Sequence, residues 1–185
     1  TDKVGQIAVD YGLSLHIDGA RILNAAVAQK VDVRRLAASA TSVAFCLSKG
    51  LCAPAGSLLC GSYDFVREAR RIRKQLGGGM RQAGVLAAAG IVALHKMIDR
   101  LEEDHNRALT LAKGLSGLGG IQIEYKTNAT NMVYLLIKND NKMTAGEVSA
   151  KLRERNILVG SVSEKRIRMV THYWITDEDI EFTIE

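Results

Sequence analysis

Three short stretches near the start of the chain have hydrophobic patterns that predict β-strands, and these are residues 13–18, 43–47 and 57–60. In the first stretch apolar and polar side chains alternate, which places His16 and Asp18 together on its polar face. The second is a continuous apolar run, typical of a strand that is buried on both faces. Gly19 ends the first strand, and a helix is expected over residues 20–30.

The middle of the chain has the pattern of helices. Residues 63–76 predict an amphipathic, basic helix, and the three glycines at 77–79 separate it from a long helix expected over 81–118. This long helix is small and apolar as far as Leu94 and then becomes increasingly charged. The change indicates burial at one end and exposure at the other.

A glycine-rich segment, residues 117–120, is the best candidate for a domain boundary. The elements expected after it are a strand at 121–125, a strand at 132–137, a helix at 144–156, a strand at 167–171 and a final helix from Thr176. Thr176 followed by Asp179 is close to a capping box. Strands that alternate with helices favour an α/β architecture for residues 1–118, followed by a small α+β domain at 119–185.

Composition places the chain among ordinary globular proteins, since it has 185 residues, 47% of them hydrophobic and 24% charged. No apolar run approaches the ~20 residues that cross a bilayer. The first residues do not have the pattern of a secretory signal, and the chain lacks an initiator Met and ends within a short predicted helix, so we expect part of a longer protein. Three cysteines in one apolar stretch favour a reducing compartment, the cytoplasm or alternatively the mitochondrial matrix.

No metal site is predicted, because the cysteine spacings match no zinc pattern and His95 and His105 are out of phase on their helix. The net charge of +5 is concentrated between Arg67 and Arg81. A solvated helix face explains it most simply, with a phosphate contact by one or two arginines as an alternative. Nucleic-acid binding is disfavoured because no stacking aromatic residues are interleaved with these charges, and no membrane partner is expected.

Lys49 says most about chemistry. It is the only charged residue between Arg35 and Asp64, and it follows the second predicted strand. Burial of a lone lysine favours its neutral amine, which can attack a carbonyl. The alternative is that its ammonium reaches solvent along an apolar stem.

Asp18 also ends a predicted strand, and ligands of open α/β sheets bind outside the carboxyl ends of strands, so Asp18 and Lys49 can converge there. A carboxylate beside a pyridine nitrogen keeps that nitrogen protonated and makes the ring an electron sink. Arg21, on the first helical turn that follows, could reach the same site. Taken alone, Asp18 could instead stabilise a helix dipole. Together the three residues predict an enzyme that uses pyridoxal 5'-phosphate (PLP).

Four segments then carry a resemblance to a known family, and they are HIDGAR at 16–21, CLSKGLCAPAGS at 46–57, GGGMRQ at 77–82 and RIRMVTH at 166–172. In this order they resemble low-specificity L-threonine aldolase, a family of fold type I PLP enzymes. The resemblance implies part of the large PLP-binding domain in residues 1–118 and a small C-terminal domain in 119–185. It also implies a carbon–carbon lyase of amino-acid metabolism that cleaves L-threonine or L-allo-threonine to glycine and acetaldehyde.

The resemblance implies a role for each matching residue. Lys49 corresponds to the lysine that binds PLP as a Schiff base, and Asp18 to the partner of the pyridine nitrogen. Arg21 corresponds to an arginine near the cofactor O3′ and the substrate carboxylate, and Arg168 to the arginine that binds that carboxylate. Arg81 corresponds to an arginine that reaches the PLP phosphate, often that of a neighbouring subunit, so a homotetramer or homodimer is expected. Without the resemblance, Arg168 could be an exposed strand charge and Arg81 a helix-start residue.

Supporting roles are expected for Ser48, beside the lysine, for His16, which could hold the Asp18 carboxylate or be structural, and for His172, which could orient Arg168. Cys52 stands where many members of the family have glycine. The family's glycine-rich phosphate loop and ring-stacking histidine are expected N-terminal to this chain. Another fold type I reaction, such as transamination or β-elimination, and a catalytically incomplete fragment that serves in subunit association are the alternatives.

Overall fold

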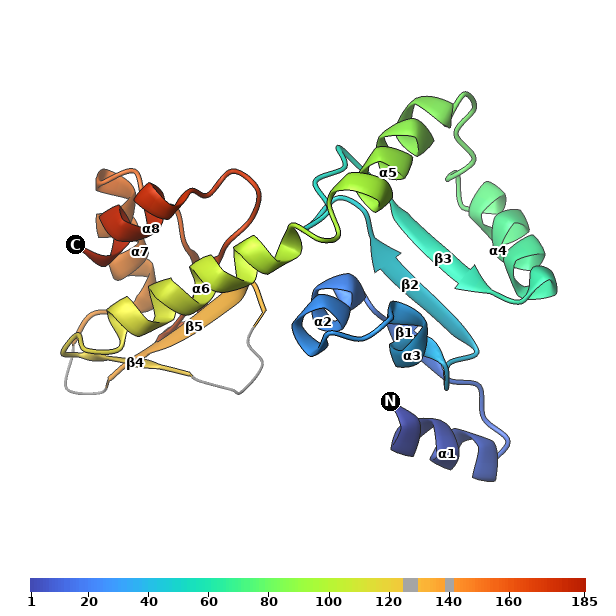
Figure 1. Ribbon diagram of the computed structural model, residues 1–185, viewed down its shortest axis with the longest axis horizontal. Coiled ribbons are helices and arrows are strands. Elements are labelled where there is room, and N and C mark those ends of the chain that lie inside the picture. Colours follow the sequence, from blue (N-terminus) through green and yellow to red (C-terminus); the bar gives the residue numbers. More distant parts are fainter. Residues whose placement is uncertain (125–129, 139–141) are drawn as a thin grey trace. The chain divides into compact units, whose positions relative to one another are not determined.

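The computed structural model describes residues 1–124, 130–138 and 142–185 (Figure 1). It divides into two compact units, unit 1 (Thr1–Asp99) and unit 2 (Arg100–Glu185). The elements of unit 1 are α1 (Asp2–Asp10), β1 (His16–Asp18), α2 (Ile22–Gln29), α3 (Val33–Ala37), β2 (Ser42–Cys46), β3 (Ser57–Gly61), α4 (Tyr63–Gln75) and α5 (Gly84–Lys96). Those of unit 2 are α6 (Leu101–Leu115), β4 (Ile121–Ile123), β5 (Met132–Ile137), α7 (Ala145–Glu154), β6 (Gly160–Ser163), β7 (Arg166–Val170) and α8 (Asp177–Ile184).

The sheet of unit 1 has the order β1-β2-β3. β1 is parallel to β2, with Asp18 opposite Ala44, and β2 is antiparallel to β3, with Cys46 opposite Ser57. Because side chains alternate along a strand, five polar residues share one face of this sheet. We call it the polar face, and it carries His16, Asp18, Ser42, Cys46 and Ser57.

Two glycines allow close packing at the ends of β1 and β2, because a side chain at either position would meet a neighbouring atom. A Cβ on Gly19 would lie 3.2 Å from the Ala44 carbonyl oxygen, to which the Gly19 N–H donates a hydrogen bond of 2.8 Å. A Cβ on Gly90 of α5 would lie 2.9 Å from the Leu47 side chain. Helix α5 therefore packs directly against the chain that leaves β2, just before Lys49.

Unit 2 contains an antiparallel sheet of order β4-β5-β7-β6. Alternate residues of β5 and β7 are buried, and they pack against α6, α7 and α8 in one hydrophobic cluster (Figure 1). Its buried members are Ala108, Leu111, Ala112, Leu115, Val133, Leu135, Ile137, Ala145, Ile167, Met169 and Ile180. The opposite face of this sheet carries polar side chains, including Arg168.

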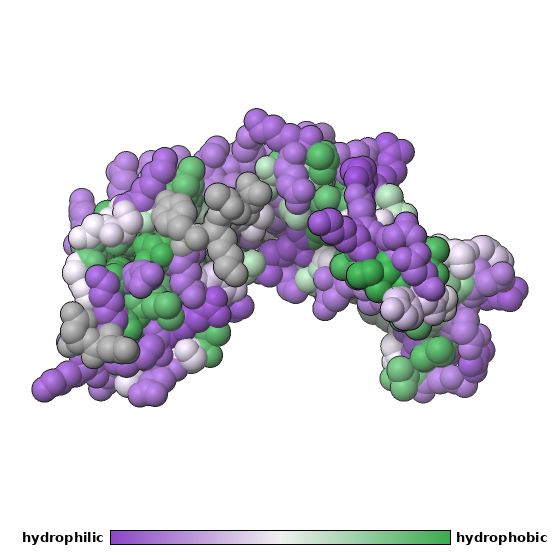
Figure 2. Space-filling view, turned by 90° about the horizontal axis from the view of Figure 1, so that it is seen from below, coloured by the Kyte–Doolittle hydropathy of each residue, from purple (hydrophilic) through white to green (hydrophobic). Residues whose placement is uncertain are grey.

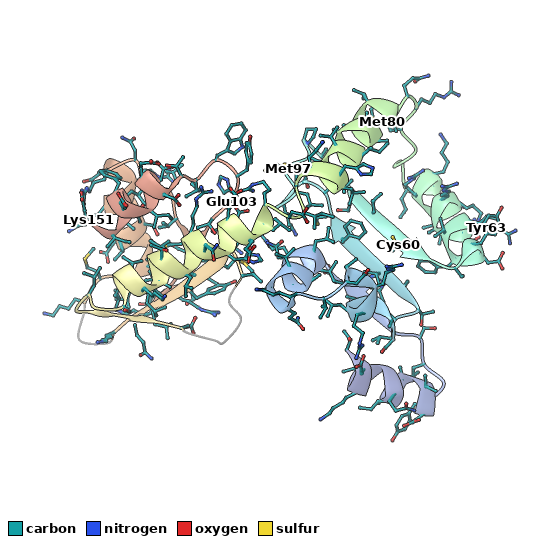
Figure 3. The ribbon with its side chains drawn as sticks, viewed as in Figure 1. Cys60, Tyr63, Met80, Met97, Glu103 and Lys151 are labelled. Carbon is teal, nitrogen blue, oxygen red and sulfur yellow. The ribbon has the colours of Figure 1, made fainter. Side chains whose placement is uncertain are left out.

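The long helix expected over 81–118 is wrong, because the chain forms two helices, α5 and α6, separated at residues 97–100. Met97 caps α5, and it is labelled in Figure 3. Three acidic residues occupy the first turn of α6, where they interact favourably with the partial positive charge of a helix N-terminus. The charges thus mark a second helix start. Since α6 packs in the core of unit 2, the division falls at Asp99–Arg100, earlier than the expected 117–120.

Other elements match the expected types with shifted ends, and some were not expected. The first strand is shorter than the expected 13–18, and helices α1 and α3 and strand β6 were not predicted. The strand expected at 121–125 is described as Ile121–Ile123, and Tyr125 lies outside the described residues. The capping box at Thr176 and Asp179 is confirmed.

Among the described residues no helix is both long and apolar enough to cross a membrane. Hydrophobic side chains are nevertheless exposed in places, as the green residues between purple ones in Figure 2 show. In unit 1 they include Leu59 of β3, Phe65 and Ile72 of α4, and Leu76, which follows α4. These four residues line an open apolar groove.

Candidate functional site

Lys49 lies in a compact loop that follows β2. The loop is closed by backbone hydrogen bonds, from the Cys52 N–H to the Lys49 carbonyl at 2.9 Å and from the Ala53 N–H to the Leu47 carbonyl at 3.0 Å. Leu47, Leu51 and Ala53 are buried beneath it. The apolar residues of this stretch therefore anchor the loop and fix the backbone of Lys49 at the carboxyl end of β2.

Asp18 and Arg21 lie in the neighbouring connection, between β1 and α2. Asp18 is the last residue of β1, and Arg21 is the N-cap of α2. This connection is joined to β2 by two hydrogen bonds, from Gly19 to the Ala44 carbonyl and from the Cys46 N–H to the Ala20 carbonyl at 3.4 Å. The carboxyl ends of the two parallel strands thus bring both predicted segments to the same edge of the sheet.

The thiol of Cys46 lies on the polar face, and neighbouring groups affect its pKa. The hydroxyl of Ser57 donates a hydrogen bond to the Cys46 sulfur at 3.4 Å and is the main cause that lowers the pKa of this thiol. Burial raises that pKa, hydrogen bonding and charge from Lys49 lower it, and the charge of Asp18 raises it. The contact with Ser57 on β3 is therefore the main influence on this thiol.

One expectation about Lys49 is wrong. Its side chain is exposed, and β2 is only half-buried along most of its length. Leu47, Gly50 and Leu51 take the buried positions on either side, so the loop turns Lys49 outward. Desolvation within unit 1 is therefore not what distinguishes this lysine.

In the described part of the chain, the charged residues of the candidate site are not held by ion pairs. Within the described residues no ion pair engages Asp18, Lys49, Arg21, Arg81 or Arg168, whereas seven other arginines pair with carboxylates. These are Arg34, Arg35, Arg67, Arg71, Arg100, Arg107 and Arg166.

Arg21 gives a direct test of whether the site fits a phosphorylated, ring-bearing cofactor. Its Nε is buried and has no hydrogen-bond partner among the described residues. A buried donor without a partner costs free energy that an anionic or polar ligand would recover. Arg21 lines a cavity of about 10 Å³ together with Cys46 and Gly50, which is room for one water and not for a cofactor. A cofactor would therefore lie outside this cavity, at the edge of the sheet where Asp18 and Lys49 are both exposed.

The remaining predicted residues of unit 1 are placed as follows. Arg81 is exposed in the turn before α5 and not in the helix itself. Ser48 is exposed beside Lys49. The Nδ1 atom of His16 lies 2.8 Å from the Ser42 hydroxyl, so the hydrogen bond expected with Asp18 is replaced by one across to β2. This follows from the parallel register, which sets His16 directly opposite Ser42.

Unit 2 carries Arg168 and His172. Arg168 is exposed on β7, opposite Tyr134 of β5, on the face away from the hydrophobic core. The Nδ1 atom of His172 accepts a hydrogen bond from the Trp174 N–H at 3.3 Å, which orients the ring toward the segment before α8. The expected contact of His172 with Arg168 is not among the hydrogen bonds of the described residues.

Three members of the polar face, Ser42, Cys46 and Ser57, were not identified from the sequence. Small polar residues at alternate positions of a strand share a face, but they are only a weak sign of a site. Ser42 and Cys46 stand four residues apart, which makes the sign weaker still. The contact between Cys46 and Ser57 depends on the antiparallel register of β2 and β3, which the hydrophobic pattern does not specify.

A family model described as beta-eliminating lyase matches residues 1–139. The chain belongs to the beta-eliminating lyase family. This membership covers the whole of unit 1, including the loop of Lys49.

Several proteins of known name are similar to this member of the beta-eliminating lyase family. Low-specificity L-threonine aldolase 1 of Arabidopsis thaliana is 45% identical over 184 residues, covering 100% of this chain and 51% of its own length. Low specificity L-threonine aldolase of Escherichia coli K12 is 40% identical, covering 91% of this chain and 48% of its own length. The chain thus spans about half the length of the curated relatives that it matches.

Solved structures show the same fold. The threonine aldolase of Leishmania major superposes with a TM-score of 0.73 over 98% of this chain and 53% of its own, at 16% sequence identity. The α/β fold of this family member is therefore shared with threonine aldolases of solved structure, as the resemblance implied.

Proposed function

We propose that this chain supplies the lysine-bearing part of a PLP site that cleaves L-threonine or L-allo-threonine to glycine and acetaldehyde. The parallel pairing of β1 and β2 carries the proposal, because it brings the end of β1, with Asp18, and the loop after β2, with Lys49, to the same edge of the sheet. The names of the relatives, low-specificity L-threonine aldolases, support this substrate class. The activity is proposed for the complete protein.

The residues of unit 1 would divide the binding of PLP among them. Lys49 would hold it covalently through Nζ, and the Asp18 carboxylate would hold a proton at the ring nitrogen. The buried Nε of Arg21 has a hydrogen bond to donate near the same edge of the sheet, and Arg81 would reach the phosphate. When bound, PLP supplies a cationic ring that withdraws electrons from the substrate bond being broken.

The substrate carboxylate would be bound by guanidinium groups. Arg168 and Arg21 are the candidates, since a guanidinium presents two parallel N–H donors to a carboxylate. Both lack ion-pair partners among the described residues, so neither would have to give up an internal contact to bind substrate. Both arginines would act by orienting the substrate, because the bond to be cleaved must be correctly aligned for the reaction barrier to fall.

Substitution of Lys49 tests the assignment of the cofactor residue. The protein mixed with PLP is expected to develop the yellow absorbance of lysine-bound PLP, and borohydride followed by peptide mass spectrometry should locate the adduct on Lys49. Lys49→Ala should abolish both signals, because no other amine replaces Nζ beside Asp18. Lys113→Ala, on the exposed side of α6, is the matched control and should retain them. Yellow colour retained by Lys49→Ala would refute the assignment.

Product analysis with L-threonine separates this reaction from its rivals. Glycine and acetaldehyde in equal amounts are expected, whereas transamination or β-elimination would give a keto acid. Failure of the chain to take up PLP at any concentration would favour the incomplete fragment that serves in subunit association.

We also infer a homodimer or homotetramer in a reducing compartment, the cytoplasm or the mitochondrial matrix. The resemblance that gives Arg81 a role at a neighbouring subunit supports the oligomer, and the three free cysteines support the compartment. Sedimentation of the complete protein with and without Arg81→Ala tests the first inference.

A further inference from the structure

Two arginines lie on the outer face of the unit 2 sheet, the face turned away from the hydrophobic core. Arg166 and Arg168 are two residues apart on β7, so their side chains leave the same face roughly 7 Å from each other. Tyr134 of β5 lies directly opposite Arg168. Because a guanidinium binds a carboxylate through paired N–H donors, two free arginines at this spacing could bind both ends of a dicarboxylate.

Arg166, however, is already occupied by a carboxylate of the chain itself. Its Nε donates a hydrogen bond of 2.7 Å to the Glu124 side chain, and its guanidinium lies 4.4 Å from the centre of the Tyr134 ring. The Glu124 N–H donates to the Tyr134 carbonyl at 2.9 Å, which fixes the acid beside that ring. The side chains of Arg166 and Glu124 are only 38% and 29% exposed. Glu124 therefore neutralises Arg166 in a fixed position.

Arg168 differs from Arg166 although both lie on the same face. It is exposed, and among the described residues it has no ion-pair partner. The residues that pair with this part of β7 and share its outer face bear no charge, and they are Met132, Tyr134 and Leu136 of β5 and Gly160 of β6. In the described part of this face, one positive charge of β7 is thus compensated and the other is left for a ligand.

We propose that Glu124 is a specificity-determining residue. By neutralising Arg166, it makes the surface beside Arg168 accept a ligand with one carboxylate and reject a dicarboxylate. A second carboxylate would be repelled by Glu124, and it could use Arg166 only by displacing a partly buried ion pair. The inference rests on the proposed role of Arg168 in binding the substrate carboxylate. It restricts the substrates to β-hydroxy-α-amino acids whose side chain is uncharged.

The first test measures how the two arginines respond to simple carboxylate ions. The Nε–H resonances of Arg166 and Arg168 are followed by NMR during titration with butyrate and with succinate, at constant ionic strength. The two ions have equally long carbon chains and differ by one carboxylate. In the natural protein only the Arg168 resonance should shift, and the ratio of the two dissociation constants is the reference.

In Glu124→Gln both resonances should shift, because Arg166 is released. The ratio should then move in favour of succinate by about fivefold, the effect of one added charge pair at close range in water. Glu124→Gln combined with Arg166→Leu should lose this gain.

Two further variants serve as controls for this titration. Arg166→Leu breaks the same ion pair without releasing a cation, so the ratio should stay as in the natural protein. Glu102→Gln alters the net charge by the same amount as Glu124→Gln. It is exposed in the first turn of α6, which packs on the other face of the sheet, so it should also leave the ratio unchanged.

The second test uses the complete protein and compares two substrates. Cleavage of the Cα–Cβ bond converts 3-hydroxyaspartate to glycine and glyoxylate, as it converts threonine to glycine and acetaldehyde. In Glu124→Gln the ratio of kcat/KM for 3-hydroxyaspartate to that for threonine should rise by about fivefold, whereas Arg166→Leu should not raise it. A residue that only stabilised the sheet would affect both substrates alike.

The outcomes separate this inference from the proposed function. An unchanged ratio of succinate to butyrate binding in Glu124→Gln, or an equal gain in Arg166→Leu, would overturn the specificity role and leave threonine cleavage standing. Failure of the complete natural protein to cleave threonine would overturn the proposed function. The titrations would still decide whether Glu124 shields Arg166 from carboxylates.

Discussion

Cys52 has a left-handed backbone conformation, with φ of +56°, in the loop that carries Lys49. Glycine adopts this conformation without a steric penalty, whereas other residues pay about 1–2 kcal/mol. The chain therefore holds its lysine loop closed with a strained residue, and the hydrogen bond from the Cys52 N–H to the Lys49 carbonyl is part of what maintains it.

Cys52→Gly should raise the free energy of unfolding by about 1 kcal/mol relative to Cys52→Ala, because the alanine variant keeps the strained φ and loses only the thiol. Urea denaturation of the two variants side by side measures the difference. Equal stability of the glycine and alanine variants would mean that the loop relaxes without cost.

At the scale of elements, helix α1 is held to α3 by an ion pair. Nη1 of Arg35 donates to the Asp2 carboxylate at 2.8 Å, and Ser39 adds a hydrogen bond at 3.2 Å. The hydrogen bond from Arg35 is the main cause that lowers the pKa of Asp2 from 3.8 to about 2. A carboxyl whose folded pKa is depressed stabilises the fold above its unfolded pKa, and this contribution is lost as pH falls through the folded value.

The docking of α1 should therefore be unaffected down to about pH 4 and weaken between pH 4 and pH 2. Carboxyl NMR of Asp2 would follow the titration, and amide shifts of Gly5, which packs against Ser39, would follow the docking. In Arg35→Gln the midpoint should return toward 3.8. An unchanged midpoint in that variant would assign the depression to the chain terminus instead.

Helix α6 begins with a buried charge. Asp104 is fully buried, and Arg100 binds both of its carboxylate oxygens, at 2.6 and 3.2 Å. Removing one partner of a buried pair leaves an uncompensated charge, so Arg100→Leu should lower the free energy of unfolding of unit 2 by about 3–5 kcal/mol. Arg107→Leu, also in α6, breaks a more exposed pair with Asp177 of α8 and should cost at most about 1 kcal/mol. Similar losses in the two variants, measured by urea denaturation, would contradict this.

The elements that could be predicted from the sequence are those whose signals are local. The capping box at Thr176 and the strand ends that carry Asp18 and Lys49 are of this kind. Strand β6 is exposed throughout and exists because it pairs with β7, so its own residues contain no hydrophobic pattern. Helix α1 has no side-chain cap and buries only Gly5 and Ala8, which leaves little for a pattern to detect.

The residues of the candidate site were also predictable only where their signals are local. Lys49 and Asp18 stand out as charges at strand ends, but the exposure of Lys49 depends on which residues of its loop face inward. The partner of His16 and the contact of Cys46 with Ser57 depend on register between strands, which is set by pairing along the whole sheet.

At the scale of the whole molecule, the two units differ in how much apolar surface they bury. The hydrophobic cluster of unit 2 joins three helices to one face of its sheet. Unit 1 leaves many large apolar side chains exposed, including Val9, Tyr11, Leu76 and Val85. Since burial of apolar surface is the main favourable contribution to folding, unit 2 should be the more stable unit in this chain.

The chain contains separate natural probes for testing this difference. Trp174, the only tryptophan, lies in unit 2, and all three cysteines lie in unit 1. In a urea titration we expect labelling of the half-buried Cys46 and Cys52 to reach its midpoint at a lower concentration than the change in Trp174 fluorescence. Two midpoints would show that the units unfold separately, since a single cooperative transition gives the same midpoint for every probe.

Arg100→Leu supplies the control for this interpretation. It should lower the midpoint seen by Trp174 and leave the thiol midpoint in place, because the buried pair with Asp104 belongs to unit 2. Coincident midpoints in the natural protein, shifted together by this variant, would instead show that the units unfold as one. The lysine loop would then draw its stability from the C-terminal core, and the strain at Cys52 would be borne by the whole chain and not by unit 1 alone.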